Sequence, residues 1–145
     1  MGQTILKIAD GNKDIADAQS VRYDVFTEEQ GIEHEADADG LDSDSDHVLA
    51  YQDGDPVGTV RLRYIEPDIA KIERFAVKSK LRGQGLGKLI MQKALDHLKS
   101  KNIIEIVLDS QSHTKGFYEK FGFEQFGKEF EEVGIPHVKM RKTIS

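Results

Sequence analysis

A glycine-rich, basic segment gives the strongest chemical signal in the sequence. It reads KLRGQGLGK at residues 80–88 and lies between a predicted strand and a predicted amphipathic helix. Glycines at alternate positions let the backbone turn sharply and approach a ligand closely. The first N–H groups of a helix have no internal partner, and the helix dipole is positive there. With the added charges of Arg82 and Lys88, the segment predicts a site for an anion such as a phosphate group.

Two common phosphate-binding motifs do not match this segment. A Walker A loop has the pattern GxxxxGK[ST], but here Gly83 and Gly87 stand one residue too close, and Leu89 replaces the hydroxyl that binds Mg²⁺. A dinucleotide-binding fingerprint has the pattern GxGxxG at the start of a βαβ unit. Here the spacing is GxGxG, and predicted antiparallel strands precede it. Both motifs are therefore excluded.

The elements that must position this loop follow from hydrophobic periodicity and turn signals. The order is strand, helix, three strands, helix, strand, helix and two strands, which predicts an α/β fold with a mixed sheet. The predicted strands cover residues 4–9, 47–52, 57–65, 69–77, 103–108, 124–131 and 136–142. The predicted helices cover residues 13–30, 85–100 and 113–120. Because residues 103–108 are almost continuously apolar, we expect that strand to be buried on both faces.

The composition indicates one folded domain. The chain has 145 residues, of which 38% are hydrophobic and 32% charged, and its net charge is −6. Acidic chains are poorly suited to nucleic-acid binding, which depends on basic surfaces. No apolar run reaches the roughly 18–20 residues of a membrane span, and the lack of Cys rules out disulfides, thiolate metal sites and a catalytic thiol. We therefore expect a single cytoplasmic domain over residues 1–145, with no nucleic-acid or membrane partner.

The loop and its surroundings resemble one known family. The pattern R-x-x-G-x-G, present as RGQGLG at residues 82–87, closely resembles the acyl-CoA pyrophosphate loop of the GNAT superfamily of N-acetyltransferases. IERFAV at residues 72–77 resembles the strand before that loop, and LDSQSHTKGFYEKFGF at residues 108–123 resembles the family's fifth strand and the helix after it. VRYDVFTEEQ at residues 21–30 and GIPHVKM at residues 134–140 are similar to a bacterial branch of small GNAT proteins.

The resemblance implies a fold and a cofactor. The fold is a mixed, twisted sheet of about six to seven strands with helices on both faces. Two parallel strands, at residues 69–77 and 103–108, would splay apart to admit acetyl-CoA and release CoA as product. Main-chain groups of Phe75, Ala76 and Val77 would bind the pantetheine arm as an added strand would. The backbone N–H groups expected to hold the pyrophosphate belong to Arg82, Gly83, Gln84, Gly85, Leu86, Gly87 and Lys88.

The implied reaction is direct transfer of an acetyl group from a thioester to an amine. Tyr118 matches the family's usual general acid, which protonates the departing thiolate. Glu73 is the candidate base, acting directly or through water. The alternative role of Tyr118 is core packing, and the alternative role of Glu73 is an ion pair with a basic neighbour, namely Arg61, Arg63 or Arg74. The other function that stays open is a non-catalytic acyl-CoA-binding module.

The acceptor side is expected to lie near the acidic segment at residues 24–46, which has ten acidic residues and no Lys or Arg. Its charges would favour a cationic amine, although a solvated acidic loop explains them equally well. The acidic residues singled out at the end of the first helix are Glu28, Glu29, Glu33 and Glu35. Gln111 and His113 are expected to orient the acceptor or relay protons, with capping of its helix as the alternative role of His113. His137 is expected to line the acceptor site, with a structural hydrogen bond as its alternative role. The partner is then a small-molecule or peptide amine. The sequence leaves the oligomeric state open, with a homodimer as one option because dimers are frequent in this superfamily.

No metal site is expected. The segment at residues 42–46, with the sequence DSDSD, superficially resembles a Ca²⁺ loop. His47 occupies the position that needs Gly, and Asp53 the position that needs a bidentate Glu. The histidines also lack the spacing of metal ligands.

Overall fold

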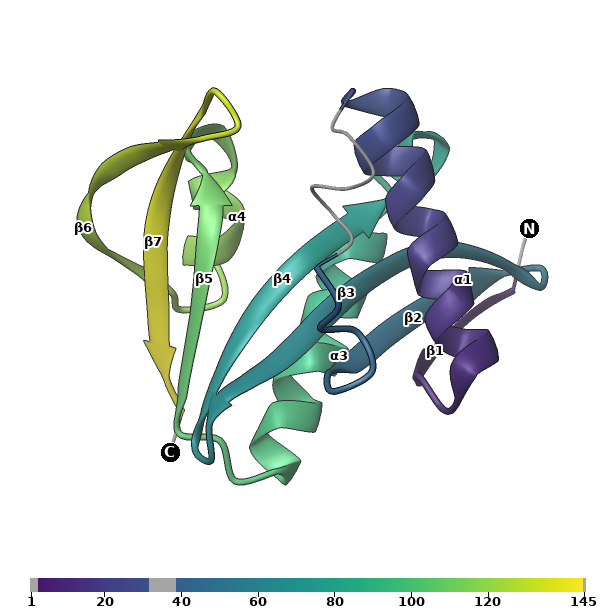
Figure 1. Cartoon of the computed structure of the whole chain (residues 1–145), viewed down its shortest axis with the longest axis horizontal. Coiled ribbons are helices and arrows are strands. Elements are labelled where there is room, and N and C mark those ends of the chain that lie inside the picture. The colour runs from purple at the N-terminus through teal and green to yellow at the C-terminus, as the bar shows by residue number, and fades with distance from the viewer. Residues whose placement is uncertain (1–2, 32–38, 145) are drawn as a thin grey trace.

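A seven-stranded sheet forms the centre of the molecule (Figure 1). The structure is a computed structural model that describes residues 3–31 and 39–144. The strands are β1 (Thr4–Ile8), β2 (Asp46–Gln52), β3 (Asp55–Glu66), β4 (Ile69–Val77), β5 (Glu105–Gln111), β6 (Glu124–Glu132) and β7 (Ile135–Thr143). The helices are α1 (Asn12–Arg22), η1 (Tyr23–Glu29), η2 (Ser79–Leu81), α3 (Leu86–Ser100), η3 (Ser112–Thr114) and α4 (Lys115–Glu119). The spatial order of the strands is β1-β2-β3-β4-β5-β7-β6.

The mixed α/β architecture predicted from the sequence is confirmed. All the predicted strands form, and within the described residues β4 and β5 are the one parallel pair. The DGDP segment makes the β2–β3 turn, with positive φ values of 52° at Asp53 and 86° at Gly54, as expected for a tight hairpin. In the described part of the chain, no helix has the length and apolarity that crossing a membrane requires.

The main core lies between the sheet and α3. Along α3, Ile90, Ala94 and Leu98 recur at four-residue spacing, so their side chains form one stripe, and all three are fully buried. The opposite face of the sheet is covered by α1, which packs on β2, β3 and β4 (Figure 1). Helices therefore lie on both faces, as the resemblance implied, but α1 does not extend over β5.

Two local expectations need correction. The predicted helix at residues 13–30 is α-helical only to Arg22 and continues as the π-helical η1. The N–H of Gln30 donates to the carbonyl of Val25, five residues earlier, at 3.1 Å. The prediction that residues 103–108 form a strand buried on both faces is wrong. β5 begins at Glu105 and alternates between buried and half-exposed positions, because Ile106 and Leu108 join the main core on one face and α1 leaves the other face open (Figure 1).

A bulge in β4 separates the two parallel strands. Between the β3–β4 pairs Thr59–Ala76 and Arg61–Glu73, β4 has one more residue than β3. Arg74 within this interval has a φ of +54°, a left-handed conformation typical of bulges and uncommon for a residue with a side chain. The ladder between β4 and β5 ends at Ile72–Leu108, and beyond that point the two strands diverge (Figure 1).

Candidate active site

A cleft of about 850 Å³ opens where β4 and β5 diverge. One wall is the end of β4 with η1, and the other is the end of β5 with α4 and the turn between β6 and β7. The glycine-rich loop closes one end. The sequence-predicted site residues that line this cleft are Glu73, Phe75, Ala76, Val77, Arg82, Gly83, Gly85, Gly87, Lys88, Gln111, His113, Tyr118 and His137. Segments far apart in the sequence thus meet around one cavity.

The loop at residues 82–88 has the backbone geometry that its glycines predicted. Gly83 and Gly85 have φ values of +80° and +81°, which residues with side chains rarely adopt. Gly85 is also the N-cap residue of α3. At Gly87 the limit is space, because a Cβ would lie 3.2 Å from Cζ of Phe75. The unpaired N–H groups at the start of α3 adjoin the cleft and suit an anion.

Two residues of the predicted loop site do not line the cleft. The Gln84 side chain instead donates from Nε2 to the carbonyl of Lys80 at 3.2 Å. The Leu86 side chain is buried in the core beside α3. Only the main chain of these two residues is left for a ligand at the loop.

Arg82 is ion-paired in this structure. Its guanidinium contacts both carboxylate oxygens of Glu29, with Nη2 to Oε2 at 2.9 Å, and its Nε donates to the carbonyl of Val77 at 3.0 Å. Glu29 belongs to η1, so the pair joins η1 to the loop at the edge of the cleft. Glu28 and Glu29, expected on the acceptor side, do not line the cleft, and Glu33 and Glu35 lie outside the described residues.

The edge of β4 offers main-chain groups to an extended ligand. Past the last pair with Leu108, the segment from Glu73 to Val77 has no partner strand on its β5 side among the residues that the structure describes. The bulge also changes which face each side chain occupies. Phe75 and Val77 pack with the main core, whereas Ala76 packs with Val21 and Val25. An extended chain could therefore bind this edge by strand addition.

Tyr118 combines core packing with access to the cleft. Its ring is 9% exposed and lies edge-on to Phe75, Phe117 and Phe123, with centroid separations of 6.5, 5.1 and 6.2 Å. Burial raises the pKa of the Tyr118 phenol above its usual value, so the hydroxyl stays protonated at neutral pH. Within residues 3–31 and 39–144, no protein group hydrogen-bonds that hydroxyl. The phenol is thus a neutral donor facing the cleft.

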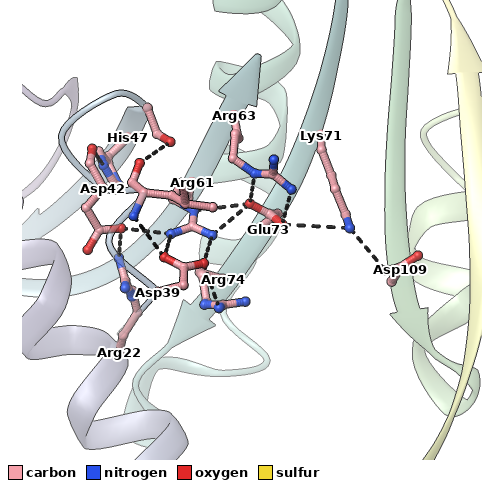
Figure 2. Close-up of polar contacts among 12 residues, drawn as sticks. Arg22, Asp39, Asp42, His47, Arg61, Arg63, Lys71, Glu73, Arg74 and Asp109 are labelled. Atoms are coloured by element: carbon pink, nitrogen blue, oxygen red, sulfur yellow. Dashed lines mark hydrogen bonds and ion pairs between the residues drawn. The ribbon is translucent and has the colours of Figure 1, made fainter. Parts of the chain in front are cut away.

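Glu73 is held by arginines. Its Oε1 accepts from Arg61 Nη2 at 2.8 Å and from Arg63 Nε at 2.9 Å (Figure 2). Burial alone would raise the pKa of this carboxyl, but the hydrogen bonds from Arg63 and Arg61 outweigh burial and lower the pKa. The ion pairing considered as the alternative is therefore present, with Arg61 and Arg63 but not Arg74. A carboxylate with a lowered pKa is a weak base.

A buried arginine organises the region behind Glu73. Arg61 is fully buried, and its guanidinium reaches Asp39 at 2.7 and 2.8 Å and Asp42 at 3.0 Å (Figure 2). Asp42 also accepts from Arg22 of α1 at 2.9 Å. Sequence analysis missed this cluster. The available signal was the pair Arg61 and Arg63 in one predicted strand, close in sequence to the acidic segment at residues 24–46, which has no Lys or Arg. Asp39 and Asp42, near the end of the acidic segment, therefore pair with arginines and are not simply part of a solvated loop.

The segment that resembles a Ca²⁺ loop has other roles. Asp42 contacts the two arginines just described, and Asp46 accepts from Tyr64 at 2.5 Å and from His97 at 2.8 Å. Among the described residues, no group of three or more His, Cys, Asp or Glu side chains is arranged to hold a metal ion.

Polar side chains line the cleft on its β5–β7 side. Gln111 ends β5, and the exposed His113 follows it in η3. His137 of β7 has Nδ1 2.7 Å from the carbonyl of Ile135 and Nε2 3.8 Å from Glu132. The structure adds Lys71 and Asp109, which sequence analysis did not single out. Their pairing depends on the register of β4 and β5, which a single sequence does not reveal.

Comparison with known proteins defines the family. The family model described as acetyltransferase (GNAT) domain matches residues 13–144, so the chain belongs to the GNAT family. It is 39% identical over 136 residues to the Bacillus subtilis protein YyaT, covering 91% of this chain and 90% of YyaT. It is 33% identical to the uncharacterized N-acetyltransferase YjcF of that species, covering 93% of this chain and 96% of YjcF.

A solved structure agrees with this assignment. The crystal structure of an acyl-CoA N-acyltransferase from Pseudomonas aeruginosa matches with a TM-score of 0.85 and 30% identity, covering 98% of this chain and 99% of that chain. The chain is thus an N-acetyltransferase of the GNAT family. The resemblance identified from the sequence is confirmed.

Proposed function

We propose that this enzyme moves the acetyl group of acetyl-CoA directly to the primary amine of a small molecule or peptide. The observation that carries the proposal is a single cleft in which the unpaired edge of β4, the glycine-rich loop and the Tyr118 phenol lie together. These are the three parts that an acyl-CoA thioester needs: a strand-like partner for its arm, an anion site for its pyrophosphate and a proton donor for its sulfur.

The residues present fit such a donor. The pyrophosphate binds at the main chain of residues 82–88, where Gly83 and Gly85 allow close approach and Lys88 is exposed. Arg82 adds a second cation once it leaves Glu29. The pantetheine arm pairs with the main chain from Phe75 to Val77. The thioester then lies toward Tyr118, and the donor supplies an activated acyl group there.

Tyr118 and Glu73 carry out the two proton transfers that the reaction requires. As the amine nitrogen bonds to the carbonyl carbon, the C–S bond breaks and Tyr118 gives its proton to the sulfur. The proton that the amine loses passes through a water molecule held by Glu73 to the solvent, and Tyr118 regains a proton from the solvent after the thiol leaves. Oε1 of Glu73 accepts from Arg61 and Arg63, whereas Oε2 accepts from Arg63 Nη2 at 3.2 Å and lies 3.8 Å from Lys71. Glu73 therefore acts through water, because its lowered pKa makes it a poor permanent proton acceptor.

A release assay tests the proposal. Acetyl-CoA and a panel of primary amines are incubated with the enzyme, and free thiol is measured. Amine-dependent thiol release with an acetylated product supports the transferase. CoA binding by calorimetry without thiol release from any amine would favour the acyl-CoA-binding module instead.

A further inference from the structure

Lys71 and Asp109 form an ion pair at the point where β4 and β5 diverge, and the proposed reaction does not use it. Lys71 Nζ is 3.3 Å from Asp109 Oδ2 (Figure 2). The two residues flank Ile72 and Leu108, the last pair of the parallel ladder. Both side chains line the cleft, with exposures of 27% and 25%. The pair is therefore accessible to a molecule in the cleft.

We propose that Lys71 and Asp109 bind an acceptor that carries both an ammonium and a carboxylate, such as an amino acid. Asp109 takes the amine end and Lys71 takes the carboxylate end. The inference rests on the proposed function and specifies its acceptor class. Each protein charge exchanges its present partner for the opposite charge of the ligand.

Charge balance favours a zwitterion over a simple amine. An amine without a carboxylate would draw Asp109 away and leave Lys71 with only Glu73, whose carboxylate lies 3.8 Å away and already pairs with Arg61 and Arg63. A charge left in a partly buried cleft without a close partner is unfavourable. A zwitterion satisfies both protein charges at once, so it binds without that cost.

The neighbouring strand strengthens the preference for a carboxylate. Lys139 of β7 lies directly opposite Asp109 in the β5–β7 ladder; it is exposed, its Nζ lies 5.9 Å from the centroid of the Phe130 ring, and it stands next to the cleft lining rather than in it. Asp109 is thus flanked by a lysine on each side of its strand. A ligand with several positive charges, such as a polyamine, meets repulsion there. This arrangement replaces the acidic segment as the source of acceptor selectivity.

The test compares amino acids with their carboxamides, which keep the amine and lose the negative charge. Thiol release is measured with the protein amino acids and then with the carboxamide of each acceptor that is turned over. We expect kcat/KM to be at least about ten-fold higher for the acid than for its amide, since a charge-assisted contact is worth roughly one such factor. In Lys71→Met the ratio should fall to about one, mainly through KM. Equal use of acid and amide by the parent enzyme would overturn the proposal.

Exchanging the charges of Lys71 and Asp109 distinguishes a role in acceptor recognition from a purely structural role of the ion pair. In Lys71→Asp with Asp109→Lys, the ion pair can re-form, but the amine end of the ligand is drawn to the wrong strand. We expect the thermal midpoint to recover relative to the single variants while turnover of the acid does not. Recovery of both would show that the pair only holds the strands together and would overturn the proposal.

Lys13→Met is the matched control. Lys13 forms an exposed Lys–Asp pair with Asp17 on α1 at 2.9 Å, and neither residue lines the cleft, so the acid-to-amide ratio should be unchanged. If no amine yields thiol, the proposed transferase fails, and acceptor binding is decided by calorimetry on CoA-saturated enzyme. Amino-acid binding that is lost in Lys71→Met then supports the site, and no binding of any amino acid overturns it.

Discussion

Glu29 accepts hydrogen bonds from the Arg82 guanidinium at both of its carboxylate oxygens, beside the loop where the donor's phosphates are proposed to bind. Arg82 must leave this partner before it can meet a phosphate. The exposures of the two side chains are 44% and 34%, so solvent screens the pair, and such pairs contribute about 0.2–1 kcal/mol.

We therefore expect Glu29→Gln to tighten CoA binding by up to about five-fold, the factor that corresponds to about 1 kcal/mol. Isothermal titration with CoA measures the change. Asp24→Asn is the control: Asp24 lies in η1 as Glu29 does and pairs with Lys78, the residue after β4, at 3.1 Å, but it does not line the cleft. Unchanged or weaker binding in Glu29→Gln would show that the pair does not compete with the phosphates.

Replacing Tyr118 with Phe should slow turnover while leaving donor binding intact. The substitution removes only the hydroxyl and keeps the ring among Phe75, Phe117 and Phe123. General acid catalysis contributes about 10²–10⁴-fold, so kcat should fall at least about 100-fold, whereas the Kd for CoA should change little. Tyr51→Phe is the control, since the Tyr51 hydroxyl contacts Asp17 outside the cleft. Full activity in Tyr118→Phe would remove the phenol from the reaction.

The conformation of Gly85 should limit donor binding. With φ at +81°, this position disfavours β-branched residues most and tolerates Asn best among residues with a side chain. We expect Gly85→Val to weaken CoA binding by about ten-fold or more, and Gly85→Asn to weaken it much less. Calorimetry of both variants, with circular dichroism to verify folding, tests this ranking. Equal affinities for the two variants would place the phosphates elsewhere.

Loss of Arg61 should destabilise the fold. Arg61→Met removes the fully buried guanidinium that the exposed Asp39 and the half-buried Asp42 and Glu73 share as a partner. Removing one member of a buried ion network costs about 3–5 kcal/mol, and we expect that loss in the free energy of unfolding measured in urea. Lys13→Met, which breaks an exposed pair, should cost less than about 1 kcal/mol. A similar small loss in Arg61→Met would mean that the other arginines replace it.

The same cluster predicts an acid limit to stability. Burial opposes ionisation of Asp42, but hydrogen bonds from Arg22 and Gln19 outweigh it and lower its pKa to about 2, and hydrogen bonds from Arg61 lower the pKa of Asp39. Because the folded pKa values lie below the unfolded ones, this stability is fully present above about pH 5 and is lost as the pH falls toward 2. Urea unfolding between pH 6 and 2.5 should show a steep decline. A decline equally steep in Arg61→Met would assign it to other carboxylates.

The sequence predicted the strands and the loop because their determinants are local. Alternating apolar residues define the strands, and Gly83 and Gly85 supply the left-handed positions that the turn into α3 needs. Tyr118 was singled out because it belongs to a continuous motif, FYEKFGF at residues 117–123. It lines the cleft, and its role as the acid stays a prediction. These features depend on neighbours within a few positions along the chain.

The parts that escaped prediction depend on contacts between distant segments. Arg61 meets Asp39 and Asp42 across separations of 22 and 19 residues, and Lys71 meets Asp109 only because of the strand register. The two-sided burial predicted for residues 103–108 failed for the same reason. An apolar run in the sequence does not reveal which faces of its strand other elements will cover. Here α1 does not extend over β5 (Figure 1).

The bulge at Arg74 leaves β4 with a row of main-chain donors and acceptors that no described strand of the protein reaches. On the rim of a sheet, such an open edge is a hazard, because it templates aggregation with foreign chains. Here the gap lies inside the sheet, between β4 and β5. The one inserted residue in β4 thus leaves an open strand edge that is enclosed within the fold and available to a narrow, flexible ligand.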